Sequence, residues 1–407
     1  MKSPSHYLRV MVCCAGGLML TATGSRAQTL AVSRDHFTVN GTAQFLVFAS
    51  YFHGLDRPAA MLSADLAWLK SKGVIGVRVW PNVSQPRLMN EDGQLNSVAL
   101  DKLRFLIGEA SARGMIVDVT FTREHIAGDF SMGEYQQAIA SAASDLRDRR
   151  NILFDLQNEW NCWSNQREMT IAALENIRAA VKAAVPALVV TASTSCHPYG
   201  EAGANAFDVL SHHGPRDRFG NWANDTGDLV RDLKWQVALT PGRVAPVYLQ
   251  EPNRFGYPFD RLDYYDSTPS HYWTSVQAAK REGAAAWTFH TAASFNMTSS
   301  TPFSALLLDG ERAVLDGLAS ALAAQPTWGI KPPIQPPSRF RRRWSRGCTL
   351  RDGLKRRWHV QPGDGNATPL VIGDRFLAFT RRGQGVAGLR AGLSVAAVEA
   401  AAPSRRL

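Results

Sequence analysis

Two glutamates stand out because each closes a short apolar run. Glu159 follows the run 154–158 (FDLQN), and Glu251 follows the run 246–250 (PVYLQ), 92 residues later. Short apolar runs of this kind are typical of strands buried on both faces. Two carboxyl groups carried at strand ends are suited to general acid–base and nucleophilic chemistry. The sequence therefore predicts a catalytic pair held on one rim of a sheet.

The elements that must position this pair alternate regularly. Helical patterns, several of which end at a glycine such as Gly73 or Gly114, separate strand-like runs along most of the chain. The eight predicted strands are 45–50, 74–80, 115–121, 152–157, 187–192, 207–211, 246–250 and 284–289. The predicted helices include 60–71, 96–113, 134–148, 167–184 and 270–282. This alternation indicates a parallel α/β architecture.

A closed (β/α)8 TIM barrel is the architecture that we expect over residues 28–328. The competing fold is a doubly wound open sheet, which normally carries a glycine-rich phosphate loop after its first strand. The segment 51–55 (YFHGL) is not such a loop. Before the barrel, Asn40-Gly41 predicts a tight turn in an N-terminal β-hairpin between 36–39 and 45–48.

Both ends of the chain differ from the barrel. Residues 1–27 combine Lys2 and Arg9, the apolar stretch 10–21 and the small-residue site at Ala27, which predicts a signal peptide. The apolar stretch is too short to span a bilayer, and we expect no transmembrane segment. Export would make the protein secreted or periplasmic.

The C-terminal region holds most of the excess charge. Residues 329–337 form a proline-rich linker, and residues 338–407 form a basic tail with 15 Lys/Arg and 4 Asp/Glu, whereas the whole chain has a net charge of +10. The tail lacks clear periodicity, and we expect it to be disordered. Two alternatives remain: a tail that binds a polyanion or an envelope polymer, and a tail translated out of frame.

The strand ends supply further polar and aromatic side chains. In a barrel of this class, functional residues project from the carboxyl ends of the strands. The candidates for substrate binding are Arg78, Asn158, His125, His212, His213, Trp287, Trp80 and Trp160. Carboxylates, histidines and aromatic residues without a phosphate loop favour carbohydrate chemistry.

This ordered set resembles clan A retaining glycoside hydrolases, and looks most like family 5, the cellulase- and mannanase-like enzymes. The resemblance covers residues 35 to about 325 and rests on the positions of Arg78, Asn158-Glu159, His212/His213, Glu251 and Trp287 along the strands. Family 5 members usually carry a His-x-Tyr on strand six, whereas this chain has His212-His213-Gly214 there. A neighbouring clan A family is therefore an alternative.

The resemblance implies a role for each residue. Glu159 is the expected acid/base, Glu251 the nucleophile and Trp287 the apolar floor under the sugar ring. Asn158 would contact the sugar 2-hydroxyl, and Arg78 would keep Glu251 ionised by its opposite charge. The expected partner is an oligo- or polysaccharide, and the expected activity is retaining cleavage of β-glycosidic bonds in a mannan or glucan.

No cofactor, metal or nucleic-acid partner is expected for the barrel, which we expect to be a monomer. Adjacent residues of a strand point in opposite directions, so His212 and His213 are a poor pair of zinc ligands. Cys162 and Cys196 follow neighbouring strands, and either a disulfide or two unpaired thiols fits them. The rival function is a barrel that binds sugar without cleaving it.

Overall fold

The computed structural model describes residues 28–90, 92–123, 131–161, 169–195, 200–214, 222–253, 267–297, 300–325 and 328, together with 370–372 and 375–377. The predicted signal peptide, His125, Cys162 and Cys196 lie outside these residues. The chain divides into two compact units, residues 1–341 and 342–407. In the second unit, the described residues form one antiparallel pair, β12 (Leu370–Ile372) and β13 (Arg375–Leu377).

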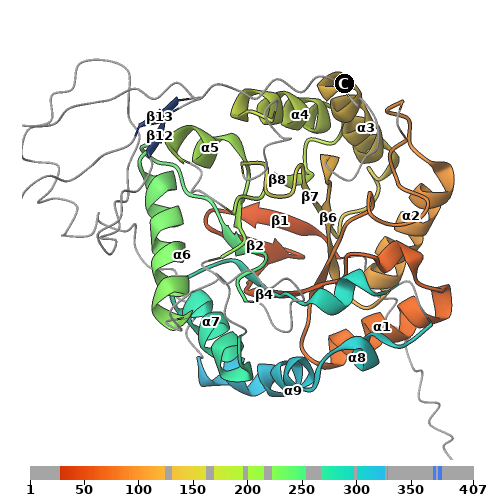
Figure 1. Ribbon diagram of the computed structural model, residues 1–407, viewed down its shortest axis with the longest axis vertical. Coiled ribbons are helices and arrows are strands. Elements are labelled where there is room, and N and C mark those ends of the chain that lie inside the picture. Colours follow the sequence, from red (N-terminus) through yellow and green to blue (C-terminus); the bar gives the residue numbers. More distant parts are fainter. Residues whose placement is uncertain are drawn as a thin grey trace, which may run out of the picture. The chain divides into compact units, whose positions relative to one another are not determined.

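The first unit is a parallel eight-stranded barrel inside a ring of helices (Figure 1). Its strands are β4 (Leu46–Ser50), β5 (Gly76–Val79), β6 (Ile116–Thr120), β7 (Ile152–Asp155), β8 (Val189–Thr191), β9 (Leu210–His212), β10 (Val247–Leu249) and β11 (Ala286–Phe289). They are ordered β8-β7-β6-β5-β4-β11-β10-β9, and a parallel bridge between Thr194 and His212 closes the circle. All eight predicted strands and the predicted barrel are confirmed.

The helices lie on the outside of the barrel, each between two of its strands or after the last one. They are α1 (Ala59–Ser71), α2 (Ser97–Ala112), α3 (Met132–Asp145), α4 (Ile171–Ala184), α5 (Gly200–Ala206), α6 (Trp222–Ala238), α7 (Pro269–Arg281), α8 (Phe303–Leu306) and α9 (Asp309–Ala324). Two short 3-10 helices, η1 (Gly54–Asp56) and η4 (Ala292–Phe295), follow β4 and β11. Local capping fixes several starts: Asn96 accepts from the Ala99 N–H at the start of α2, and Ser131 forms a capping box with Glu134 at α3.

The N-terminal hairpin differs from its prediction in one strand. Asn40 and Gly41 do form the turn, with φ of 53° and 79°, but the strand after it is β3 (Thr42–Gln44). The segment 46–50 belongs to the barrel instead, because its register pairs it in parallel with β5 and β11. A strand that the sequence did not reveal, β1 (Leu30–Ser33), pairs with β2 (His36–Val39) and completes an antiparallel sheet.

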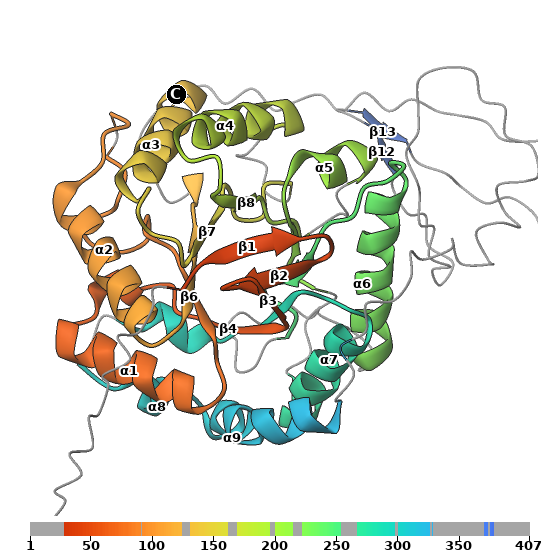
Figure 2. The same cartoon turned by 180° about the vertical axis from the view of Figure 1, so that it is seen from behind.

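This small sheet closes the amino-terminal end of the barrel, as Figure 2 shows. Leu30, Phe37 and Val39 form one buried cluster with side chains from the beginnings of the barrel strands, such as Leu46 and Ile116. Burial of apolar surface on this scale is the main source of stability in a fold of this kind. The open end of the barrel is therefore the carboxyl end of the strands, where the predicted site lies.

Candidate active site

The interior of the barrel changes from apolar to polar toward the carboxyl ends of the strands. Alternate residues of a strand point to opposite faces, so Arg78, Asp118 and Asp155 share the interior of β5, β6 and β7. The Arg78 side chain is fully buried, as are both aspartates. A buried charge is costly unless it is paired, and the interior supplies that pairing.

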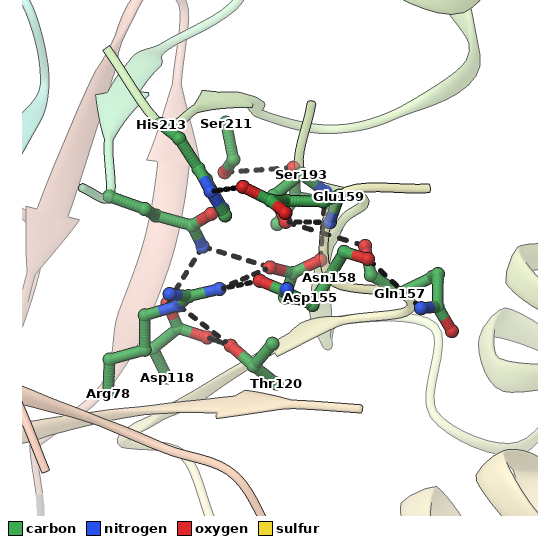
Figure 3. A network of polar contacts seen from close by, with 12 residues as sticks. Arg78, Asp118, Thr120, Asp155, Gln157, Asn158, Glu159, Ser193, Ser211 and His213 are labelled. Atoms are coloured by element: carbon green, nitrogen blue, oxygen red, sulfur yellow. Dashed lines mark hydrogen bonds and ion pairs between the residues drawn. The ribbon is translucent and has the colours of Figure 1, made fainter. Parts of the chain in front are cut away.

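Arg78 is the centre of this polar network (Figure 3). Its Nη1 donates to Glu251 Oε1 at 2.7 Å, and its Nη2 donates to Asn158 Oδ1 at 2.8 Å. Its Nε donates to Thr120 Oγ1 at 3.0 Å. Burial alone lowers the pKa of Arg78, but the charges of Glu251, Asp118 and Asp155 reverse this effect and raise it. The guanidinium is therefore a permanent positive charge beside Glu251.

Two aromatic rings lie over this guanidinium. The carbon at its centre is 5.6 Å from the ring centroid of Phe52 and 5.4 Å from that of Trp80, both within the range of cation–π attraction. The two rings are stacked on each other at 4.0 Å, and Phe295 of η4 packs against both. Trp80 is almost fully buried, whereas Phe295 is 38% exposed.

The two glutamates of the predicted pair meet at His213. The Nδ1 atom of His213 lies 2.8 Å from Glu159 Oε1 and 3.4 Å from Glu251 Oε2. One ligand-type atom from each of these three side chains lies within 4.8 Å of the other two. All three are buried, and they come from segments after β7, β9 and β10. The structure thus brings together side chains that are far apart in the sequence.

The backbone conformation at the ends of the strands sets the direction of these side chains. Glu159 has a φ of +46°, a left-handed conformation that is uncommon outside glycine, and its N–H donates to Ser193 Oγ at 3.2 Å. Such conformations concentrate at functional sites. Gly214 has a φ of +92°, and a Cβ there would lie 2.4 Å from Pro252 Cα. Glycine therefore permits the close approach of the segments that carry His213 and Glu251.

A second histidine touches the nucleophile candidate. His290 directly follows β11 and lies two residues after the inward-facing Thr288. Its Nε2 is 3.5 Å from Glu251 Oε2. Its Nδ1 is 2.9 Å from Ser50 Oγ, which fixes the ring. Our candidate set from the sequence omitted His290. Side chains alternate in direction along β11, so His290 lies on the same face as Thr288, and this alternation could have identified it from the sequence.

Other candidates occupy different places. Trp287 is fully buried and points toward α7, where its indole N–H donates to Ser275 Oγ at 3.1 Å. The expected sugar floor is therefore not at Trp287, because the strand alternation that turns His290 inward turns Trp287 outward. Trp160 is partly buried against the main core. His212 lies at the end of β9, and its Nδ1 accepts from the Gly214 N–H at 2.9 Å.

The same three side chains, Glu159, His213 and Glu251, are also a combination that could hold a metal ion. Carboxylate oxygens and an imidazole nitrogen are common ligands of divalent cations. Arg78, however, already places a positive charge 2.7 Å from Glu251 and would repel a second cation. The absence of a metal requirement stays a prediction, and it is tested by chelation below.

Comparison with known structures places this geometry in a fold family. One similar structure is a family 5 glycoside hydrolase (subfamily 18) from Streptomyces cattleya, solved with Manβ1-4GlcNAc, with 18% identity over 72% of this chain and 83% of that chain and a TM-score of 0.53. Another is the endo-1,4-β-mannanase of Rhizomucor miehei, with 14% identity, 73% and 99% coverage, and a TM-score of 0.50. The chain has the fold of these glycoside hydrolases.

The resemblance to family 5 that the strand-end residues indicated is thus confirmed for the fold. No family model and no curated protein matches the chain at the level of sequence. Within the part of the chain that the structure describes, no helix is long and apolar enough to cross a membrane.

Proposed function

We propose that the protein is a retaining β-glycosidase in which Glu251 is the nucleophile and Glu159 the acid/base. The observation that carries this proposal is the approach of the two carboxyl groups, whose closest ligand atoms lie within 4.8 Å beside His213. Retaining glycosidases hold their two carboxyl groups about 5–5.5 Å apart, whereas inverting ones need about 6.5–9.5 Å to admit a water. The separation here favours retention.

The proposed reaction has two steps. Glu251 Oε2 attacks the anomeric carbon while Glu159 donates its proton to the leaving glycosidic oxygen, so that a glycosyl-enzyme ester forms and the C–O bond breaks. Glu159, now ionised, then takes a proton from water, and the resulting oxygen displaces Glu251 from the anomeric carbon. The product keeps the original configuration, and both carboxyl groups return to their starting states.

The neighbouring residues support the ionised state that the nucleophile needs. Arg78 favours the ionised form of Glu251 through a hydrogen bond and an opposite charge. It also holds the Asn158 amide by its oxygen. We propose that this amide contacts the sugar 2-hydroxyl, an interaction that strengthens toward the transition state.

The substrate class that we propose is a β-glycan of the mannan or glucan type. The structures of similar fold include a family 5 enzyme with Manβ1-4GlcNAc bound and an endo-1,4-β-mannanase. Residues 1–27 carry the pattern of an export signal, and we propose that the protein is secreted or periplasmic. N-terminal sequencing of the exported protein would test that location.

The decisive experiment compares Glu159→Gln and Glu251→Gln with the wild type on β-mannans, β-glucans, xylan and activated aryl β-glycosides. Each variant should lose at least about a hundredfold in kcat. Azide should rescue Glu159→Gln with a product of retained anomeric configuration, and Glu251→Gln with a product of inverted configuration. Full activity in both variants would refute the proposed roles.

A further inference from the structure

Asp118 is a buried carboxyl group to which the proposed reaction gives no role. It lies on β6 inside the barrel, with a fully buried side chain. Its Oδ2 is 3.6 Å from Arg78 Nε and accepts from Tyr248 Oη at 3.0 Å and from Gln250 Nε2 at 2.9 Å. Its Oδ1 is 3.0 Å from Thr120 Oγ1. Asp118 thus belongs to the network that holds Arg78 and, through Arg78, Glu251.

The charges around Arg78 do not balance. One guanidinium contacts three carboxyl groups, namely Asp118 of β6, Asp155 of β7 and Glu251, which follows β10. A surplus of negative charge away from water is costly, and such sites commonly retain a proton. One of the three carboxyl groups is therefore expected to be neutral over part of the pH range.

The contacts distinguish the three groups. Glu251 has the shortest contact with Arg78, at 2.7 Å. Asp155 accepts from the Ser193 N–H at 2.9 Å and from Gln250 Nε2 at 3.1 Å, in addition to Arg78 at 3.4 Å. Asp118 is the farthest from Arg78, and its Oδ1 accepts from Thr120 Oγ1, which itself accepts from Arg78 Nε. Asp118 therefore has the weakest direct contact with the positive charge and is the group best placed to hold the proton.

The ionisation of the neighbours agrees with this assignment. Burial raises the pKa of Asp118 to about 7, since it outweighs the opposing charge of Arg78 and is reinforced by Asp155. Burial and the charge of Asp118 raise the pKa of Tyr248 well above its usual range, so the phenol stays a neutral donor. Arg78 stays charged. The raised pKa of Asp118 thus agrees with its weak contact to Arg78.

We propose that Asp118 is a positioning residue that holds the surplus proton of the three carboxyl groups around Arg78, so that the loss of this proton acts on the catalytic pair through Arg78. The inference rests on the proposed glycosidase function. Once ionised, Asp118 adds negative charge beneath Glu251 and Arg78 and helps Glu159 to keep its proton as the pH rises. At acidic pH, where Asp118 is neutral, it has no such effect.

The test is the variant Asp118→Asn, which resembles the protonated aspartate at every pH. On the acidic side, the pH profile of kcat/KM for this variant should match that of the wild type. On the alkaline side, the pH at which kcat/KM falls should be lower by about half to one unit, so that kcat/KM there is about three- to tenfold lower than in the wild type. Asp155→Asn is the matched control: it removes the other aspartate that contacts Arg78, at the shorter distance of 3.4 Å, and both limbs should move. A shift of both limbs in Asp118→Asn, or of neither, would overturn the proposal.

Two measurements do not depend on activity. The unfolded aspartate has a lower pKa than the folded one, so the wild type should lose stability relative to Asp118→Asn between about pH 4 and pH 7. If Asp118→Asn does not fold, carbon NMR of aspartate carboxyls in the wild type should show one group that titrates near neutral pH. Titration of every aspartate below about pH 5 would contradict the proposal. If the protein had no glycosidase activity but an aspartate still titrated near neutral pH, the proposed function would be refuted and the raised pKa of Asp118 would stand.

Discussion

The Nδ1 atom of His213 lies 2.8 Å from the carboxylate of Glu159, and the same atom is 3.4 Å from Glu251. The imidazole therefore lies between the two groups whose proton states must differ. We expect His213→Ala to lower kcat by about a hundredfold, because the imidazole that contacts both carboxyl groups would then be missing. His213→Asn, which can place an amide N–H near the position of Nδ1, should recover part of that loss.

The control for this histidine is His36→Gln, a change in the small sheet at the other end of the barrel. It should leave the kinetics unchanged. Equal losses in His213→Ala and His36→Gln would show that the effect reports general destabilisation instead of a role at the site.

Metal removal tests the second interpretation of the same three side chains. Arg78 already supplies positive charge to Glu251, so dialysis against a chelator should leave activity unchanged. Assays before and after dialysis, followed by addition of Zn²⁺ or Mn²⁺, provide the measurement. Loss of activity that returns with a metal would establish a metal site at Glu159, His213 and Glu251.

Phe295 offers the exposed part of the aromatic group at the rim. It is 38% exposed and packs on Phe52 and Trp80, which lie over the guanidinium of Arg78. We expect Phe295→Ala to raise KM for oligosaccharides by about tenfold, since a stacked aromatic ring contributes about 1 kcal/mol to binding. The stability of the protein should change little. Phe105→Ala, at an exposed position on α2, is the control. An unchanged KM for several chain lengths would exclude Phe295 from substrate binding.

Phe37 tests the closure of the barrel. It is fully buried, and its ring meets Tyr248 edge to face at 6.3 Å. Phe37→Ala should lower the free energy of unfolding by about 3–5 kcal/mol, as expected for a large core residue. Chemical denaturation measures the change, with Thr42→Ala on exposed β3 as the neutral comparison. A loss below about 1 kcal/mol would mean that the small sheet does not stabilise the barrel.

The C-terminal boundary can be tested by truncation. The indole N–H of Trp328 donates to the Ala284 carbonyl at 2.8 Å, and its ring contacts His36 at 5.8 Å. A chain that ends at Pro337 keeps these contacts and should unfold at the wild-type temperature. A chain that ends at Gln325 loses them and should be less stable by about 1–3 kcal/mol. Failure of the longer version to fold would show that the barrel requires the basic tail.

The sequence predicted the barrel strands well because burial on both faces leaves a short apolar run, as in 152–154. Glu159, Glu251, Arg78 and Asn158 could be found because each follows or ends such a run. The small sheet was harder to predict: β3 is only three residues long, and the strand pattern of 46–48 continues directly after it. Strands this short carry little periodicity.

The direction of a side chain at a strand end depends on its register, which the resemblance to a family does not give. Trp287 was therefore expected at the site on the resemblance, whereas His290 was not among the expected site residues. Partners within the network, such as Asp118, could not be found at all from sequence. Their importance depends on distances across the barrel, between residues 40 to more than 130 positions apart.

The sheet formed by β1, β2 and β3 covers the amino-terminal end of the barrel with apolar side chains. Leu30, Phe37 and Val39 fill the amino-terminal end, and Phe37 lies against Tyr248, the donor to Asp118. Within the described residues, the polar contacts of Asp118 therefore lead through Arg78 to Glu251, while apolar side chains cover the other end of the barrel. Where water is excluded, charge is screened less strongly. The apolar cover at one end of the barrel thus strengthens the electrostatic influence of Asp118 on the site at the other end.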